Sequence, residues 1–344
     1  KAFDYYYKKY QQNALEAIVK VMLRVRGSYA LGIMLKDEPG VIYTVRKDSP
    51  LIVGQNKDGK LIASDVPAIL KYTRNVYYID NLEIARLSKD DITFYNIDRE
   101  ELTKEPVEIK WDAEAAEKGG YEHFMMKEIQ EQPKAVHDTI HTYVKDNTID
   151  LSSVGLSEEE IKEIQRIYIV ACGSAYHVGI TAKYVLEDLV KIPVEVDLAS
   201  EFRYRNPVLV EDSLVLIISQ SGETADSLAA LREAKSKGIR TLAVVNVVGS
   251  SIPREADYVF YTLAGPEIAV ATTKAYSTQL IASYLLAIQF AKVRGSISET
   301  YYHQLIAELL TLPDKIAKVL EDKERVQWFA SKFSSVHDIF FIGR

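Results

Sequence analysis

The chain lacks three features that would have placed it in a narrower class. It has one cysteine, Cys172, among 344 residues, which excludes an internal disulfide framework and a cysteine-cluster metal site and is typical of a reducing compartment. It has no uninterrupted apolar run long enough to span a bilayer, so we expect no membrane segment. Its net charge of -7 leaves no basic surplus for sequence-independent nucleic-acid binding. We therefore expect a cytoplasmic protein that binds neither nucleic acid nor membrane.

The composition that remains is typical of a globular chain. Hydrophobic residues make up 47% of it and charged residues 26%, and this length predicts roughly two or three domains. Both ends resemble cut points, because the chain begins at Lys1 without Met and the strand-like run Val336–Gly343 stops where a loop should start. That run is similar in type to Ile167–Gly173. We therefore expect a piece of a longer protein that contains a repeated domain.

Residues 1–110 are predicted to be rich in β-structure. Ala14–Leu23 has apolar residues at helical spacing, and Ser64–Pro67 has the residue types of a helix N-terminus. Short apolar runs alternate with turn sequences such as Asp48–Pro50, which predicts antiparallel hairpins. The predicted strands are Tyr29–Met34, Val41–Val45, Leu51–Val53, Leu61–Ala63, Val76–Ile79, Ile84–Leu87 and Ile92–Tyr95.

The character of the sequence changes at Trp111. Residues 111–157 are predicted to be an interdomain linker with packing helices, and the helical pattern over Tyr121–Asn147 is expected to break at Pro133. Residues 298–330 are predicted to be a helical connector, and residues 331–344 the start of another domain.

Residues 158–297 alternate short apolar runs with helical patterns. This alternation predicts a parallel sheet covered on both faces, with its ligand beyond the carboxyl ends of the strands. The predicted strands are Ile167–Ala171, Val194–Val196, Leu214–Ile218, Thr241–Val245 and Tyr258–Thr262.

The stretch Ser213–Asp226 is the most informative part of this region. It predicts a buried strand, a tight loop and a helix, so that unpaired helical N–H groups and the hydroxyls of Ser219, Ser221 and Thr224 surround one point. Such a point suits a phosphate monoester. The alternative is that Ser221 or Thr224 only caps the helix.

Three motifs in this order resemble a known family. Ser219–Asp226, preceded by Ala171–His177 and followed by Glu267–Lys274, is similar to the first sugar isomerase (SIS) domain of the isomerising glutamine:fructose-6-phosphate aminotransferases, also called glucosamine-6-phosphate synthases. The remaining matches are Trp111–Pro133 in the linker and, in the glutaminase domain of the family, Arg26–Tyr29, Asp48–Leu51 and Ile62–Asp65.

This resemblance implies an α/β fold in two parts. Residues 158–297 would form a parallel-sheet SIS domain, a flavodoxin-like three-layer sandwich, preceded in residues 1–110 by the β-rich later part of an N-terminal-nucleophile glutaminase domain (αββα). The start of the glutaminase domain and most of the second SIS domain would lie outside the chain. No catalytic residue of the family is therefore expected in this piece.

The resemblance also implies binding residues. Those for the sugar phosphate are Ser174, Ser219, Gln220, Ser221, Thr224 and Val270, the last through its backbone. Asp65 matches the carboxylate that holds the α-amino group of glutamine, although its local sequence favours a helix N-cap. The family often has Thr-Ser where this chain has Ser174-Ala175, so one hydroxyl is missing and an altered contact set is expected, with the site retained.

Other reactive side chains have weaker interpretations. Cys172 is interpreted as a small packed residue in preference to a nucleophile, and His177 as packed or solvated in preference to a base. Lys274 is left open between a phosphate partner and a surface charge. The histidines show no metal-ligand spacing, so neither a metal nor any other cofactor is expected.

The first functional hypothesis is the aminotransferase of the family. It converts glutamine and fructose 6-phosphate to glucosamine 6-phosphate and glutamate, the first step of the hexosamine pathway, and its sugar site implies a homodimer. The alternatives are a non-catalytic sugar-phosphate sensor and a related fructosamine deglycase or isomerase. The glutaminase-like residues 1–110 favour the aminotransferase.

Overall fold

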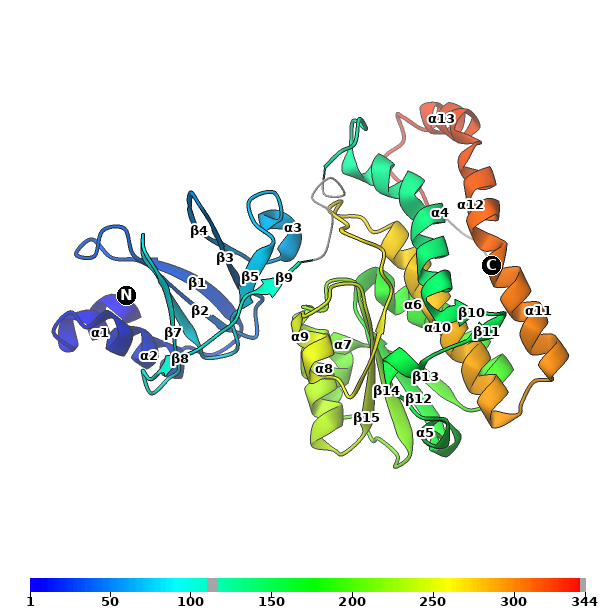
Figure 1. The fold of residues 1–344 in the computed structure, drawn as a ribbon, viewed down its shortest axis with the longest axis horizontal. Coiled ribbons are helices and arrows are strands. Elements are labelled where there is room, and N and C mark those ends of the chain that lie inside the picture. The colour runs from blue at the N-terminus through cyan, green and yellow to red at the C-terminus, as the bar shows by residue number, and fades with distance from the viewer. Residues whose placement is uncertain (110–116, 341–344) are drawn as a thin grey trace.

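The computed structural model describes residues 1–109 and 117–340. Figure 1 shows two parts: a two-sheet part in blue and cyan, and a larger part in green to orange built around one parallel sheet. No helix among these described residues is long and apolar enough to cross a membrane.

The N-terminal part is a sandwich of two antiparallel sheets between helices. Its helices are α1 (Ala2–Lys9), α2 (Ala14–Arg24) and α3 (Val66–Ile69). Its strands are β1 (Tyr29–Met34), β2 (Ile42–Lys47), β3 (Ile52–Asn56), β4 (Gly59–Ala63), β5 (Asn75–Tyr78), β6 (Ile84–Leu87), β7 (Ile92–Tyr95), β8 (Glu101–Leu102) and β9 (Val107–Glu108). The sheet orders are β1-β2-β6-β7-β8 and β4-β3-β5-β9.

Apolar residues on alternating positions hold these layers together. Val53 of β3 and Ile79, which follows β5, pack with Ala85, Leu87 and Phe94 from the other sheet, which forms the core between the sheets. A second cluster packs α2 on the outer face of β1, β2 and β6, and a third packs α3 on β3 and β5. The arrangement is therefore αββα, as expected.

One predicted hairpin is wrong. β1 and β2 form a hairpin, and so do β3 and β4, but β2 and β3 lie in different sheets. The turn at Asp48–Pro50 carries the chain across the sandwich. The reason is that the buried faces of β2 and β3 must face each other, whereas strands of one hairpin lie edge to edge.

The second part begins with the long helix α4 (Phe124–Tyr143), which contains Pro133 in its interior. The expected break at Pro133 is therefore wrong. Proline removes the N–H that would bond the carbonyl of Ile129, and the side chain of Gln132 donates to that carbonyl instead (3.1 Å). The side chain thus replaces the lost backbone bond.

A parallel five-stranded sheet forms the centre of this part, in the order β13-β12-β14-β15-β16. Its strands are β12 (Arg166–Ala171), β13 (Val194–Leu198), β14 (Ser213–Ser219), β15 (Arg240–Val245) and β16 (Tyr258–Tyr261). The remaining elements before it are β10 (Val144–Lys145), β11 (Thr148–Ile149), a short 3₁₀ helix (Ser152–Val154) and α5 (Glu158–Glu163). The strand order is that of flavodoxin-like folds, so the predicted α/β class is confirmed.

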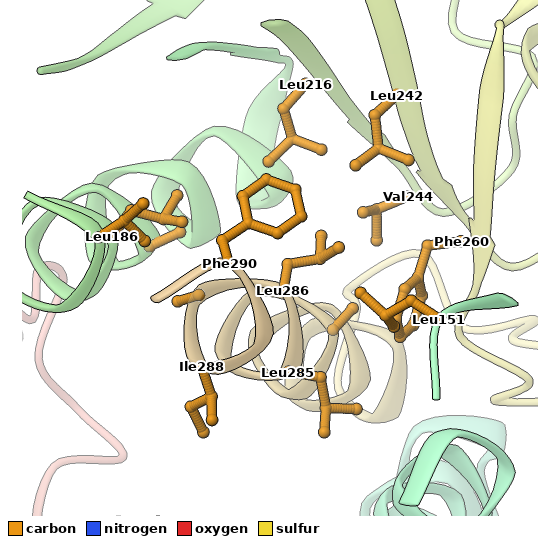
Figure 2. Packing of buried hydrophobic residues seen from close by; sticks show 14 of the residues in the cluster. Leu151, Leu186, Leu216, Leu242, Val244, Phe260, Leu285, Leu286, Ile288 and Phe290 are labelled. Carbon is orange, nitrogen blue, oxygen red and sulfur yellow. The ribbon is translucent and has the colours of Figure 1, made fainter. Parts of the chain in front are cut away.

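Helices cover both faces of this sheet. On one face lie α6 (Gly173–Val190) and α10 (Lys274–Arg294), and on the other α7 (Ala199–Arg205), α8 (Ala225–Ser236) and α9 (Ser251–Glu255). Figure 2 shows Leu286 and Phe290 of α10 directed at Leu216 and Leu242 of the sheet. The outer side of α10 is covered by α4, so this helix is buried almost all round.

After α10 the chain forms three helices, α11 (Glu299–Leu310), α12 (Leu312–Leu320) and α13 (Lys323–Lys332), so residues 298–330, predicted to be a connector, are largely helical. The strand expected over Val336–Gly343 is not formed in its described part, residues 336–340, and residues 341–343 lie outside the described chain. Phe340 is 88% exposed. A strand needs a neighbour to pair its backbone groups, and no described strand pairs with this segment.

Candidate functional site

The predicted sugar-phosphate residues meet where the strand order of the parallel sheet reverses. β12 and β14 are neighbours, and the helices that follow them, α6 and α8, lie on opposite faces of the sheet. Beyond the carboxyl ends of these strands lies a cavity of about 300 Å³. All the residues predicted for the sugar phosphate line it: Ser174, Ser219, Gln220, Ser221, Thr224 and Val270. Three segments far apart in sequence thus form one hollow.

The loop after β14, residues 219–224, is held by its own hydroxyls and is called the phosphate loop below. Ser219 Oγ accepts a hydrogen bond from Gly222 N and lies 3.1 Å from Thr224 Oγ1. Ser221 Oγ accepts from Glu223 N (3.2 Å). The loop therefore gathers its hydroxyl groups on a tight turn at the cavity.

Two helices begin at this cavity. Thr224 is the N-cap residue of α8 and Cys172 that of α6, and among the described residues neither cap side chain bonds its helix. The capping alternative for Thr224 therefore does not hold, since its hydroxyl contacts Ser219 instead. The first N–H groups of both helices carry partial positive charge, which favours an anion in the cavity.

The wall opposite the phosphate loop comes from residues 267–272. Glu267 accepts hydrogen bonds from Thr272 Oγ1 (2.7 Å), Thr273 N (2.8 Å) and Ala275 N (3.2 Å), and so joins this wall to the start of α10. Val270 is fully exposed at its tip. Sequence reasoning assigned no role to Glu267, Thr272 or Gln279, although all three line the cavity and the first two lie in a motif that the resemblance rested on.

The cavity lining contains no lysine or arginine among the described residues. Lys274 is buried and bonds Glu131 of α4 (2.7 Å), so it is neither a surface charge nor directed at this cavity. His177 is exposed on α6 outside the lining. Cys172 lines the cavity and its sulfur accepts from Ser227 Oγ at 3.9 Å. Any phosphate here would be held by hydroxyl and amide donors.

Asp65 lies at a second, larger cavity between the two parts of the molecule. This cavity, of about 510 Å³, shares Gln220, Ser221, Thr224 and Glu267 with the first. Asp65 caps α3 by accepting from Ala68 N (2.9 Å), and its other oxygen accepts from Ser64 Oγ (3.0 Å). The helix-cap interpretation of Asp65 is thus realised, and the same residue faces the phosphate loop across a cavity.

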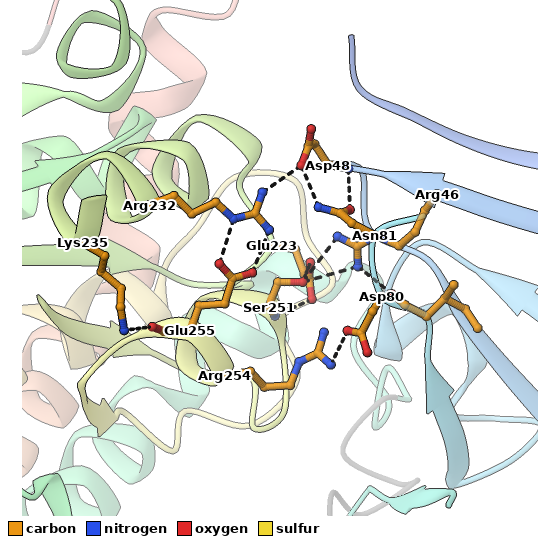
Figure 3. A network of polar contacts seen from close by, with 11 residues as sticks. Arg46, Asp48, Asp80, Asn81, Glu223, Arg232, Lys235, Ser251, Arg254 and Glu255 are labelled. Atoms are coloured by element: carbon orange, nitrogen blue, oxygen red, sulfur yellow. Dashed lines mark hydrogen bonds and ion pairs between the residues drawn. The ribbon is translucent and has the colours of Figure 1, made fainter. Parts of the chain in front are cut away.

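A polar network also ties the phosphate loop to the N-terminal part (Figure 3). Glu223 lines the second cavity but not the first, and it accepts from Ser251 N and Ser251 Oγ, both at 2.8 Å. Arg46 of β2 donates to Ser251 Oγ (3.4 Å) and to the carbonyl of Ile79 (3.1 Å). Burial raises the pKa of Glu223, although the bonds from Ser251 oppose the shift.

Two further ion pairs cross the same boundary. Arg232 of α8 bonds Asp48 (2.8 Å) and, through two nitrogens, Glu255 (2.7 Å each), and Arg254 bonds Asp80 (2.8 Å). The sequence predicted neither the Arg232–Asp48 nor the Arg254–Asp80 pair, because the partners lie in different parts of the molecule and show no local pattern.

Comparison with known proteins agrees with this architecture. Residues 160–289 match the family model of the SIS domain. The glutamine–fructose-6-phosphate aminotransferases (isomerizing) of Caldanaerobacter subterraneus and Clostridium acetobutylicum are 54% and 53% identical over 342 residues, which is 99% of this chain and 56% of each relative. The chain thus spans about half the length of these relatives.

A solved structure is also similar. The C-terminal domain of glucosamine-fructose-6-phosphate aminotransferase from Francisella tularensis superimposes with a TM-score of 0.62 and 40% sequence identity. The match covers 64% of this chain and 62% of that one.

Proposed function

We propose that this chain, which contains a SIS domain and is similar along almost its whole length to glutamine–fructose-6-phosphate aminotransferases, is the sugar-phosphate-binding portion of such an enzyme. The whole enzyme would transfer the amide nitrogen of glutamine to fructose 6-phosphate, with isomerisation, and release glucosamine 6-phosphate and glutamate. The observation that supports this most directly is the meeting of Ser174, the phosphate loop and Val270 around one cavity.

The phosphate group would lie against the phosphate loop. Ser219, Ser221 and Thr224 would donate hydroxyl hydrogen bonds, and the first N–H groups of α8 and α6 would add backbone donors. Each hydrogen bond to a charged group contributes about 1.5–3 kcal/mol, so a few of them hold a phosphate without a lysine or arginine. Ala175 offers no hydroxyl at its position, which removes one such donor relative to the family pattern.

The remainder of the sugar would extend toward Val270, and glutamine would be held elsewhere. In this proposal Asp65 binds the α-amino group of glutamine through a charge-assisted contact. The cavity that it shares with Gln220 and Ser221 lies between the two substrates. Catalytic groups would come from parts of the enzyme beyond this chain.

The experiment that tests sugar-phosphate binding removes two donors at once. Ser221→Ala with Thr224→Ala should weaken fructose 6-phosphate binding by at least about 100-fold in calorimetry, because two charge-assisted bonds are lost. Ser236→Ala with Thr311→Ala is the matched control, since these hydroxyls bond only helix carbonyls. Unchanged affinity in the first double variant would refute the assignment of the cavity.

The enzyme and sensor hypotheses are separated by activity. We expect the full-length protein to form glucosamine 6-phosphate in a glutamine-dependent reaction, whereas a sensor or a deglycase would not. We also propose a homodimer, because the exposed tip at Val270 leaves one side of the cavity open to another domain or subunit. The single cysteine, typical of a reducing compartment, supports a cytoplasmic location. A monomer in sedimentation at micromolar concentration would contradict the dimer.

A further inference from the structure

Helix α4 contacts the cavity wall formed by residues 267–272 with one of its faces. Glu128 accepts hydrogen bonds from Ile268 N (2.6 Å) and from Ala269 N (3.1 Å). One turn later, Glu131 bonds Lys274 (2.7 Å) and Gln132 accepts from Ser277 Oγ (2.7 Å), both on α10. Residues three and four apart share a helix face, so a single side of α4 holds both the wall and the helix after it.

Glu128 differs from Glu131 and Gln132 because it bonds the backbone of the wall, whereas they bond side chains of α10. The segment between β16 and α10 contains no helix or strand in its described residues 262–273, so side-chain contacts must determine its position. At its start, Asn246 bonds the backbone of Ala264 and Gly265 (2.8 and 2.7 Å). Glu128 provides the next external contact, immediately before Val270.

The environment of Glu128 makes this contact energetically demanding. Its side chain is only 2% exposed, and no lysine or arginine among the described residues forms an ion pair with it. Burial, with a smaller contribution from the charge of Glu267, raises the pKa of Glu128, and the N–H groups of Ile268 and Ala269, together with the charge of Lys274, oppose that shift. A buried carboxylate is tolerated only where hydrogen bonds satisfy it, so the two backbone N–H groups and the carboxylate hold each other in place.

What the carboxylate holds is the surface opposite the phosphate loop. Ala269, Val270 and Ala271 line the cavity together with Ser219 and Ser221. A ligand anchored by its phosphate would meet this wall with its other end. The distance between the two walls then decides whether a sugar is contacted in addition to a phosphate.

We propose that Glu128 is a positioning residue for the sugar: through Ile268 N and Ala269 N it places the Val270 wall at contact distance from a hexose whose phosphate lies in the phosphate loop. This inference rests on the proposed function and adds a residue from outside the cavity to it. Glu128 touches no ligand itself, because it does not line the cavity.

The test compares two ligands in three variants of the full-length protein. Glu128→Ala removes both acceptor contacts, and Glu128→Gln keeps one carbonyl oxygen and places an amide N–H₂ near Ala269 N. We expect fructose 6-phosphate affinity to fall by about 10-fold or more in Glu128→Ala, the loss that corresponds to about one hydrogen bond to the sugar, and by less in Glu128→Gln. Affinity for inorganic phosphate, which needs only the phosphate loop, should differ by less than about two-fold between the Glu128 variants and the unmodified protein.

Glu131→Gln is the matched control on the same helix face. It weakens the pair with buried Lys274 and should lower thermal stability, but it leaves the bonds to Ile268 and Ala269 intact. Its affinity for both ligands should stay close to that of the unmodified protein. A stability loss alone therefore cannot imitate the expected result.

The outcomes separate the inference from the proposed function. If the unmodified protein binds fructose 6-phosphate and both Glu128 variants bind it as tightly, the positioning role is refuted and the function stands. If the Glu128 variants lose both ligands in parallel, Glu128 supports the whole site and the specific role is refuted. Failure of the unmodified protein to bind the sugar phosphate overturns both.

Discussion

Gly222 is the position where a single added methyl group should disturb the phosphate loop most. Its φ is +65°, and a Cβ built there would lie 2.0 Å from Ser250 Oγ, 2.9 Å from Ser250 Cβ and 3.3 Å from Pro253 Cδ. Ser250 cannot move away freely, because it is 1% exposed and its hydroxyl donates to the carbonyl of Val247 (2.7 Å). Gly222→Ala therefore forces either the loop or the start of α9 to shift.

The size of this effect follows from two contributions. Left-handed backbone in a residue with a Cβ costs roughly 1–2 kcal/mol, and overpacking of a buried site costs about 1–3 kcal/mol. We expect Gly222→Ala to lower the free energy of unfolding by about 2–5 kcal/mol in total. Because Gly222 N bonds Ser219 Oγ, the hydroxyls of the loop should shift with it and fructose 6-phosphate affinity should fall.

The control is Gly238, which lies just past the C-terminal end of α8, the helix that follows the phosphate loop. Gly238 also has positive φ (+74°), but a Cβ there meets nothing within 4 Å. Gly238→Ala should cost only the backbone term, about 1–2 kcal/mol, and should leave sugar-phosphate affinity unchanged. Urea unfolding and calorimetry on both variants measure these quantities. The reasoning is refuted if Gly222→Ala is no more destabilising than Gly238→Ala and binds the sugar phosphate equally well.

Two further predictions concern the boundary between the two parts. Burial raises the pKa of Glu223, so the native state holds the proton of this carboxyl more tightly than the unfolded chain does. Protonated Glu223 therefore stabilises the native state fully below about pH 4.3, the pKa of the unfolded chain. That stabilisation is lost as pH rises through the raised native pKa. Glu223→Gln should therefore flatten the decline of stability in this pH window in urea unfolding, and an unchanged slope would contradict the shift. Arg232→Ala removes the bonds to Asp48 and Glu255, but its side chain is 38% exposed, so we expect a loss of only about 0.5–1 kcal/mol at low salt and less at high salt. Arg203→Ala, which loses one pair with Asp226, should cost less, and a loss independent of salt would exclude an electrostatic origin.

The local sequence pattern was sufficient to predict strands whose bounds depend only on neighbouring residues. β1, β6 and β7 have the predicted bounds, because apolar runs between turn residues leave little choice of strand. The phosphate loop also had a recognisable pattern, because serine, glycine and threonine residues follow a buried strand and precede a helix, but that pattern by itself left helix capping as an open alternative. Pro133 shows the limit of this reasoning. Its expected break depended on an unsatisfied carbonyl at Ile129, and the neighbouring side chain of Gln132 satisfies it.

The turn at Asp48–Pro50 shows a second limit. The residues on both sides were correctly predicted as strands, but the partner of each strand depends on which apolar faces meet in the core. Glu128 and Glu267 were visible as charged residues in recognised segments, yet no local signal marked them as buried acceptors of backbone N–H groups. Their roles depend on neighbours that are distant in sequence.

By itself, the sequence determined the strands β1 to β7, the parallel sheet and the donor-rich loop that follows β14, because apolar periodicity and turn chemistry act over a few residues; it did not predict α1 or the short strands β8 to β11. Only the tertiary structure decided that Ser174, the phosphate loop and Val270 share one cavity, that Asp65 faces that loop, and that Ser251, which donates to Glu223, also accepts from Arg46 of the N-terminal part. The physical reason is that burial, hydrogen bonds and ion pairs between distant segments depend on how the layers pack, and packing has no local signature in the chain.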